Sequence, residues 1–377
     1  MMILIKNIHV YGPEDLGILD VLIGTDTILC IDKFIEAAPF MDIYDGTGKI
    51  LTPGFIDRHV HVIGGGGEGG FATRTPELSL SSCIRSGITT VIGLLGTDGI
   101  TRSVEDLIAK VKALKSEGIS AYAMTGSYAY PSTTITGSVA KDIMFIDEVL
   151  GVKLALSDHR SSHISWETFL SLASEVRTAA MFANKTGCMT LHMGDEEDDL
   201  AYVLKAIRHT GLPCTMFHPT HVTRNAHLFQ KALQLLHMGG TIDITSTPKE
   251  NSAKWIKQAN PQDYDRITLS SDGQGSWSTY DENGNITSIG VSDISVLYED
   301  VIAMIKEKEF SVETCLSFVT KNPAKVLGLY PQKGSIQTDS DADLLVFDKN
   351  FDLTGVFAKG KWMMKDHEIL KKGIYEK

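Results

Sequence analysis

Cysteine is scarce in this sequence, and the cysteines present do not form a known binding pattern. The five are Cys30, Cys83, Cys188, Cys214 and Cys315. They are widely spaced and include no CxxC pair, so neither a disulfide framework nor a thiolate zinc site is indicated. Most of them lie in apolar runs, where we expect buried, reduced thiols.

Long hydrophobic runs and an excess of basic residues are also absent. No window reaches the ~18 uninterrupted apolar residues that a transmembrane helix needs. The opening segment, Met-Met-Ile-Leu-Ile-Lys-Asn, lacks the basic region and cleavage site of a signal peptide. The formal net charge is −12, which argues against nucleic acid or an anionic membrane as the main partner. We therefore expect a cytoplasmic protein.

The hydrophobic pattern divides the 377 residues into two parts. This length suits one large α/β barrel of roughly 250 residues and a smaller unit. Strand-like segments separated by Gly, Pro and Asp occur near the two ends, at 3–10, 19–23, 28–31, 342–348 and 356–364. We expect residues 1–52 and 333–377 to form one small β-sandwich-like domain, and residues 53–332 to form the barrel.

The central part alternates between short apolar runs and amphipathic stretches. Eight runs suit strands buried on both faces; they span 54–62, 88–96, 120–128, 151–158, 189–194, 214–221, 241–246 and 266–272. Helical spacing of apolar residues marks 105–117, 166–183, 200–210, 226–237 and 312–329. Repeated βα units predict a parallel sheet, and eight of them favour a closed (β/α)₈ TIM-type barrel over an open doubly wound sheet.

The clearest chemical motif is His59-Val60-His61, after a largely apolar run. Residues two apart in a strand point to the same side, so both imidazoles can reach one metal ion. Taken alone the motif is weak, because histidine pairs also occur by chance and a single buried histidine usually belongs to the core.

Further potential ligands end later strands. His192 lies near the end of the fifth run, His221 ends the sixth and Asp272 ends the eighth. The carboxyl ends of barrel strands converge, so we interpret the four histidines and the aspartate as one metal centre. His218 is left out, because Pro219 interrupts simple alternation between it and His221.

Lys153 lies in the apolar fourth run, and the neighbouring residues allow two interpretations of its role. Its ammonium could extend to the rim of the barrel. Alternatively, a buried amine carboxylated by CO₂ would supply the anion that two divalent ions need, since a buried ammonium is costly.

Several segments resemble the amidohydrolase superfamily: Gly54-Phe-Ile-Asp-Arg-His-Val-His, Leu191-His-Met-Gly, Pro219-Thr-His-Val, Ser270-Ser-Asp-Gly and Asp341-Ala-Asp-Leu-Leu-Val-Phe-Asp. Within it, others resemble the isoaspartyl dipeptidases: Ile63-Gly-Gly-Gly-Gly-Glu, Ser157-Asp-His-Arg, Thr220-His-Val-Thr-Arg-Asn and Ser271-Asp-Gly-Gln-Gly-Ser. The resemblance covers nearly the whole chain.

This resemblance implies hydrolysis of isoaspartyl (β-aspartyl) dipeptides by a bridging hydroxide on a binuclear zinc centre. It implies two Zn²⁺ per chain, bridged by carboxylated Lys153 and the hydroxide, and a homo-oligomer, as large as an octamer. Asp272 would bind metal and transfer protons, and Tyr128 would donate to the scissile carbonyl. The implied metal ligands are His59, His61, Lys153, His192, His221 and Asp272.

The resemblance also implies the contacts to the dipeptide. Glu68 offers a carboxylate to the free α-ammonium, and the glycines before it let backbone N–H groups approach closely. Arginines can grip carboxylates in a bidentate way; how Arg160 and Arg224 divide the two substrate carboxylates stays open. The implied contacts are Gly66, Glu68, Thr97, Tyr128, Arg160, Arg224 and Ser276.

Two other functions remain as alternatives. A cyclic amide hydrolase of the dihydroorotase or hydantoinase type would share the metal ligands, but its substrate has no free amine that requires Glu68. A non-catalytic scaffold of the same fold would be expected to have lost ligands, and all six are present here.

Overall fold

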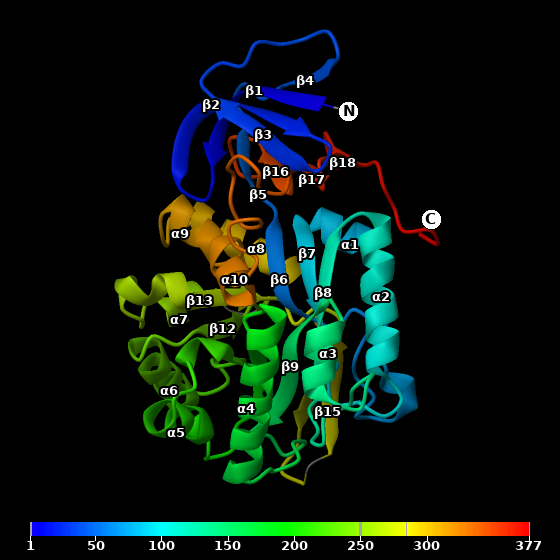
Figure 1. The fold of residues 1–377 in the computed structure, drawn as a ribbon, viewed down its shortest axis with the longest axis vertical. Helices are drawn as coiled ribbons and strands as arrows, with labels where there is room; N and C mark the ends of the chain where they lie inside the picture. The colour runs from blue at the N-terminus through cyan, green and yellow to red at the C-terminus, as the bar shows by residue number, and fades with distance from the viewer. Residues whose placement is uncertain (1, 249–250, 284, 377) are drawn as a thin grey trace.

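The computed structural model describes residues 2–248, 251–283 and 285–376. Its centre is a curled parallel sheet whose strands match the eight predicted runs (Figure 1). The strands are β6 (Phe55–Val60), β7 (Ile88–Gly93), β8 (Ser120–Gly126), β9 (Val149–Leu156), β10 (Cys188–Met193), β11 (Phe217–Thr220), β12 (Ile242–Thr245) and β13 (Ile267–Ser270).

The ladder of this sheet has two parts. Strands β6 to β11 are hydrogen-bonded in chain order, and β12 pairs with β13 in parallel. β12 lies beside β11, and β13 lies beside β6. The His61 N–H donates to the Gly273 carbonyl at 2.9 Å, which ties the chain after β13 to the end of β6. The strands thus curl in the predicted order, but β11 and β12, and likewise β13 and β6, lie side by side without a regular ladder of hydrogen bonds.

Helices follow the strands and cover the outside of the sheet (Figure 1). The longer ones are α2 (Val104–Glu117), α4 (Trp166–Ala183), α5 (Ala201–His209), α6 (Ala226–His237) and α8 (Ser295–Lys306). Shorter elements are η1 (Phe71–Thr73), α1 (Leu80–Arg85), α3 (Val139–Phe145), η2 (Cys214–Met216), α7 (Ala253–Ile256), η3 (Pro261–Arg266), α9 (Val312–Ser317) and α10 (Lys321–Leu327). The first four predicted helices are confirmed within about one residue at each end.

The prediction of one continuous helix at 312–329 is wrong. The stretch forms α9 and α10, and Thr320 between them has φ −126° and ψ −84°. Pro323 explains the break, because in a continuous helix its ring would clash with the carbonyl four residues earlier. In the first turn of a new helix a proline is tolerated.

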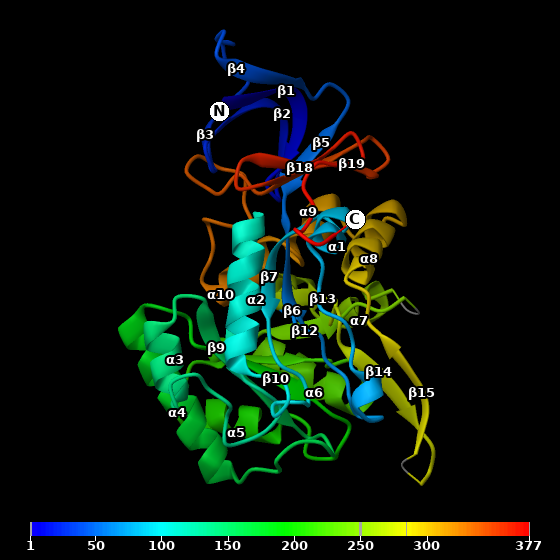
Figure 2. The same cartoon turned by 90° about the vertical axis from the view of Figure 1, so that its right-hand side faces the viewer.

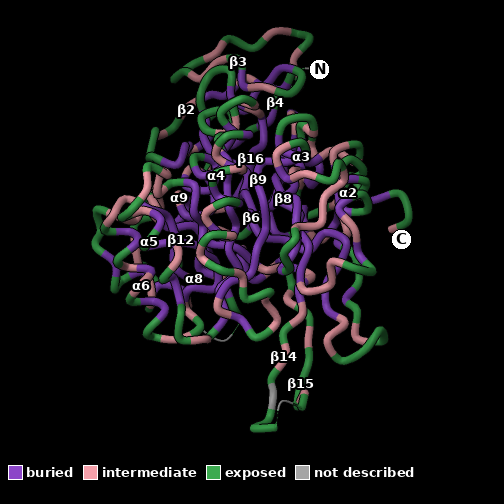
Figure 3. Tube along the Cα trace, turned by 60° about the horizontal axis from the view of Figure 1, so that its bottom comes forward, coloured by how far each residue is buried: buried purple, intermediate pink, exposed green. Residues whose placement is uncertain are grey.

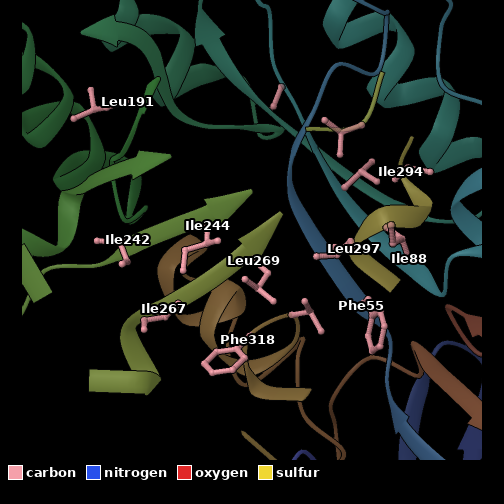
Figure 4. Packing of buried hydrophobic residues seen from close by; sticks show 14 of the residues in the cluster. Phe55, Ile88, Leu191, Ile242, Ile244, Ile267, Leu269, Ile294, Leu297 and Phe318 are labelled. Atoms are coloured by element: carbon pink, nitrogen blue, oxygen red, sulfur yellow. The ribbon is translucent and has the colours of Figure 1, made fainter. Parts of the chain in front are cut away.

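Apolar side chains fill the layer between strands and helices (Figure 4). Phe55 and Ile88 come from neighbouring strands, and Leu269 of β13 packs with Phe318, which follows α9. Three of the five cysteines, Cys83, Cys188 and Cys315, are buried and all five are free thiols, as expected. Figure 3 shows the buried strands at the centre of the molecule.

Both chain ends contribute to a second sheet. Its strands are β1 (Met2–Tyr11), β2 (Asp15–Gly24), β3 (Thr27–Asp32), β4 (Met41–Asp45), β5 (Ile50–Pro53), β16 (Leu344–Phe347), β17 (Leu353–Ala358), β18 (Lys361–Lys365) and β19 (Glu368–Ile369). The order is β19-β18-β17-β16-β5-β1-β2-β3, with β4 also on β1. The antiparallel β5–β16 pair joins the two ends. Hydrogen bonds therefore link strands from both chain ends into one sheet, as predicted; its sandwich-like packing stays a prediction.

Two features after β13 were not predicted from the sequence. One is helix α8, and the other is a hairpin of β14 (Ser276–Tyr280) and β15 (Ile286–Val291). The hairpin projects away from the curled sheet (Figures 2 and 3). Among the described residues, no helix is long and apolar enough to span a membrane.

Candidate metal centre and active site

The carboxyl ends of the strands bring the six predicted ligands together. Asp272 Oδ1 lies 3.3 Å from His59 Nε2 and 3.1 Å from His61 Nε2. One donor atom each from His59, His221 and Asp272 lie within 4.8 Å of one another. The rings of His192 and His221 have centroids 4.6 Å apart.

Lys153 completes this group from β9. It is fully buried, and its Nζ lies 3.1 Å from His59 Nε2. The side chain therefore does not extend to the rim of the barrel, which was one of the two interpretations. Burial lowers the pKa of Lys153 to about 7, so a large share of the side chain is neutral amine near neutral pH.

His221 and Asp272 both have left-handed backbone, with φ 60° and 53°. His221 directly follows β11, and Asp272 lies two residues after the end of β13. The chain turns sharply at both places. Such strain costs on the order of 1–3 kcal/mol and persists where surrounding contacts enforce it. Here it keeps the imidazole and the carboxylate directed at a common point.

The protonation states of the cluster fit divalent cations. Burial lowers the pKa of His59, His192 and His221 well below the usual value, so these imidazoles are neutral, which is their metal-binding form. Burial alone would raise the pKa of Asp272, but the hydrogen bond with His61 and nearby positive charge hold it at about 2. Neutral imidazoles and a carboxylate are ligands that Zn²⁺ prefers.

Neighbouring side chains orient the histidines. Thr245 Oγ1 lies 2.7 Å from His221 Nδ1. His192 has a partner on each ring nitrogen: the Tyr128 hydroxyl at 2.6 Å from Nδ1 and Asp158 Oδ2 at 2.9 Å from Nε2. Burial raises the pKa of Tyr128, so its hydroxyl stays protonated.

Asp158 is a site residue that the sequence interpretation missed. It is buried and accepts hydrogen bonds from Arg160 Nε at 2.9 Å and Nη2 at 2.7 Å. Burial would raise the pKa of Asp158, yet its bonds with Arg160 and His192 hold it well below the usual range. The available signal was its place at the end of the fourth run, two residues before Arg160.

Glu68 forms a second polar cluster near the histidines. Its carboxylate accepts hydrogen bonds from Thr97 at 3.0 Å and Ser276 at 3.1 Å, and Arg160 Nη1 lies 3.6 Å away. Four of the seven predicted substrate contacts therefore converge here. A cleft of about 340 Å³ runs beside this cluster and is also lined by Gly66.

The glycine-rich loop that carries Glu68 needs its glycines. Gly66 has φ 72°, and a Cβ there would lie 2.6 Å from the Thr73 carbonyl oxygen. Arg102, which was not predicted, is buried and donates to the carbonyls of Ile63, Gly65 and Thr75. These bonds fix the loop from beneath.

Arg224 approaches the centre at His192. It is exposed, with Nη2 3.3 Å from His192 Nε2. With His221, Thr245 and Trp255 it lines a cleft of about 260 Å³. His218, which was left out of the ligand set, sits near the opposite end of β11 and bonds to Thr241.

Comparison with known proteins identifies relatives of the whole chain. A crystal structure of β-aspartyl dipeptidase from Fervidobacterium islandicum AW-1, in complex with β-Asp-Leu dipeptide, matches with TM-score 0.94 and 42% identity over 98% of this chain and 97% of that one. A second structure of the dipeptidase from that organism matches with TM-score 0.90 and 40% identity over 98% of each chain. The resemblance to isoaspartyl dipeptidases is thereby confirmed.

More distant similarities are to hydantoinases. The L-hydantoinase of Paenarthrobacter aurescens is 22% identical over 93% of this chain and 86% of its own length. A D-hydantoinase structure from Thermus sp. matches with TM-score 0.68 and 16% identity over 100% of this chain and 98% of its own. Residues 50–363 match the model of the amidohydrolase family. With that match over most of its length, the chain belongs to the amidohydrolase family and is a hydrolase.

Proposed function

We propose that this protein hydrolyses β-aspartyl dipeptides at a centre of two zinc ions. The observation that carries the proposal is the Glu68 cluster beside the histidines: a carboxylate held by Thr97 and Ser276 at the edge of a cleft. The similarity to a β-aspartyl dipeptidase solved with β-Asp-Leu supports the same substrate class.

The residues of the cluster have distinct proposed roles in metal binding. His59 and His61 would hold one ion, and His192 and His221 the other, with Asp272 as a further ligand. When bound, the metal ions supply Lewis-acid activation of water and of the amide carbonyl. His59 Nδ1 and His61 Nδ1 are enclosed without a hydrogen-bond partner, while the Nε2 atoms of both rings face Lys153 and Asp272 at the proposed metal positions.

Lys153 would provide the bridging anion as a carbamate. Its neutral amine attacks CO₂, an N–C bond forms and one proton is released. Burial, which lowers the pKa of Lys153 to about 7, maintains the reactive amine. The negative carbamate would then offset part of the charge of two divalent ions in a site whose other ligands are mostly neutral.

The dipeptide would be held by its charges across the two clefts. Glu68 accepts hydrogen bonds from the α-ammonium, and backbone N–H groups near Gly66 lie on the same side. Arg160 and Arg224, of which Arg224 approaches His192 directly and Arg160 through Asp158, each pair with a carboxylate. Because Arg160 is fixed by Asp158, it loses little freedom on binding.

The chain's own groups then move the proton. The Tyr128 hydroxyl donates to the oxygen of the scissile carbonyl as negative charge develops there. Asp272, ionised because its pKa is about 2, accepts the proton of the attacking water and delivers it to the leaving amine. The C–N bond breaks, giving aspartate and the second amino acid.

We further propose that the protein acts in the cytoplasm, from the sequence features described above, and that it assembles as a homo-oligomer, from the family resemblance. Its mass in solution, measured by light scattering, tests the second.

The test of function compares three substrates with zinc-loaded protein: β-Asp-Leu, α-Asp-Leu and dihydroorotate. We expect cleavage of β-Asp-Leu only. Glu68→Gln should raise KM for β-Asp-Leu by about tenfold or more, because a charge-assisted hydrogen bond is lost. Glu77→Gln, at an exposed acid paired with Lys110, is the matched control. Turnover of dihydroorotate alone would contradict the proposal and favour a cyclic amide hydrolase.

A further inference from the structure

A second cleft lies at the opposite ends of the strands that carry the metal ligands. It has a volume of about 450 Å³ and is lined by residues at the amino ends of β10 to β13, among them Thr186, His218, Thr241 and Arg266. Helix α10, which lies against β13 (Figure 1), adds Asn322 and Lys325. The cleft is therefore separate from the site proposed for the dipeptide.

The wall of this cleft is cationic in a protein of net charge −12. Arg177, Lys185, Arg266 and Lys325 line it, against a single acid, Asp265. Within the described chain, Arg177 and Lys325 form no salt bridge, while Arg266 pairs with both Asp263 and Asp265. Two cations are thus available to a ligand.

Lys185 contributes charge but no available donor. Its Nζ donates to the carbonyls of Ile143, Ile146 and Val149 at 2.7, 2.8 and 2.8 Å. The three bonds use all of its protons and fix the ammonium in place. It therefore adds positive charge beside the two available cations without offering a donor to a ligand.

Enclosed polar atoms without partners also gather here. They are His218 Nε2, Asn322 Oδ1, Thr186 Oγ1 and Arg266 Nε. His218 and Asn322 are almost completely buried, with 0% and 1% exposure. A buried polar group without a partner costs about 1–3 kcal/mol, so a small shift of these side chains toward a ligand in the cleft would recover that cost.

We propose that this cleft binds a small phosphorylated metabolite. Its phosphate lies between Arg177 and Lys325, whose two charges match a dianion, and its hydroxyl groups face His218 and Asn322. Arginine and lysine are the usual phosphate partners in proteins. The volume exceeds that of a free phosphate ion and falls in the usual range for metabolite sites, about 300–1,000 Å³.

Titration calorimetry with glycerol 3-phosphate tests this proposal on zinc-loaded, full-length protein. We expect saturable binding that becomes at least about tenfold weaker in Arg177→Gln/Lys325→Gln, as expected for lost charge-assisted bonds. Arg208→Gln/Lys141→Gln, at two exposed cations outside the cleft, should bind as the unchanged protein does. Equal binding by the two double variants, or no saturable binding at millimolar ligand, would overturn the proposal.

Two further measurements distinguish the site and the ligand class. In crystals soaked with selenate, the anomalous signal should include a peak between Arg177 and Lys325; peaks at the metal centre alone would overturn the assignment. Succinate carries two negative charges without phosphate and should bind more weakly than glycerol 3-phosphate. If succinate bound as tightly, the phosphate assignment would be wrong.

Discussion

At the scale of single residues, Asp272 combines several properties that a proton-transfer group needs. It follows β13 in a left-handed conformation, contacts two imidazoles and remains ionised although it is only partly exposed. A carboxylate in that position can bind a cation and accept a proton at different stages of one reaction.

The Asp272→Asn variant should lose activity by a factor of roughly 10² to 10⁴, the usual contribution of a general acid or base. An amide oxygen can still contact a metal ion but cannot accept the proton. Steady-state kinetics with β-Asp-Leu, together with metal analysis, check this expectation. Asp26→Asn, at an exposed acid far from the site in sequence, is the control, and wild-type turnover by Asp272→Asn would contradict the assignment.

A site residue can be found from the sequence when the pattern that marks it lies within a few neighbouring residues. His59 and His61 can be recognised by their two-residue spacing, and Asp272 by its place after an apolar run. Asp158 acts through His192, 34 positions away, and no local pattern reports that contact. Arg102 likewise supports a loop 27 to 39 positions earlier.

At the scale of elements, the glycine-rich loop sets the position of Glu68. Gly66→Ala should lower kcat/KM for β-Asp-Leu by about tenfold or more, because the new Cβ displaces the Thr73 carbonyl and with it the loop. Gly48→Ala is a matched control: its φ is also positive, at 75°, but nothing lies within 4 Å of its Cβ. Both variants should lose about 1–2 kcal/mol of stability from backbone strain, and only Gly66→Ala should lose activity. Equal activities would show that the loop tolerates the side chain.

A pH-dependent contact joins helix α2 to the start of β9. Glu148 accepts hydrogen bonds from Lys112 and Lys115; burial opposes them, yet they lower its pKa from 4.5 to about 2. The pair therefore stabilises the fold fully above pH 4.5 and loses this effect as the pH falls through about 2.

Glu148→Gln should cost roughly 1–2 kcal/mol at pH 7, allowing for the solvent exposure of both lysines. The difference from the unchanged protein should shrink as the pH approaches 2. Urea unfolding of metal-free protein at pH 7 and pH 3 measures this change, with the exposed Glu105→Gln as control. A difference that stays constant over this range would rule out the ion pairs as its source.

Helices and strands could be predicted from the sequence where their burial leaves a simple hydrophobic pattern. The strands of the curled sheet are buried on both faces and leave continuous apolar runs. The β14–β15 hairpin was not predicted because it is largely exposed. It mixes polar residues with Trp277 and Ile289 and so has no clear hydrophobic pattern. The terminal sheet was predictable as strands, but its pairing across the whole chain was a guess from composition.

At the scale of the whole molecule, bound metal should stabilise the fold, since the ligands come from five different strands or strand ends. Removing metal with a chelator should abolish activity and lower Tm; a ligand at 1,000 times its Kd adds about 4 kcal/mol. Calorimetry and metal analysis should find that zinc restores both with two equivalents per chain. A single equivalent, or an unchanged Tm, would contradict a binuclear centre.

We propose that residues 1–52 with 333–377 form one domain and residues 53–332 the other. The boundary falls before Pro53, the last residue of β5, and Gly54 alone separates β5 from β6. Such a short connection, with β16 bonded to β5, leaves little freedom between the two parts.

The pairing of β5 with β16 also has a consequence for biosynthesis. A chain leaving the ribosome exposes β1 to β5 while nearly three hundred further residues are still to be translated. During that time one edge of β5 has no partner, and unpaired edges readily pair with other chains. Contacts so distant along the chain also form slowly. The terminal sheet therefore closes only when the C-terminal strands arrive, and truncated translation products keep an open, aggregation-prone edge.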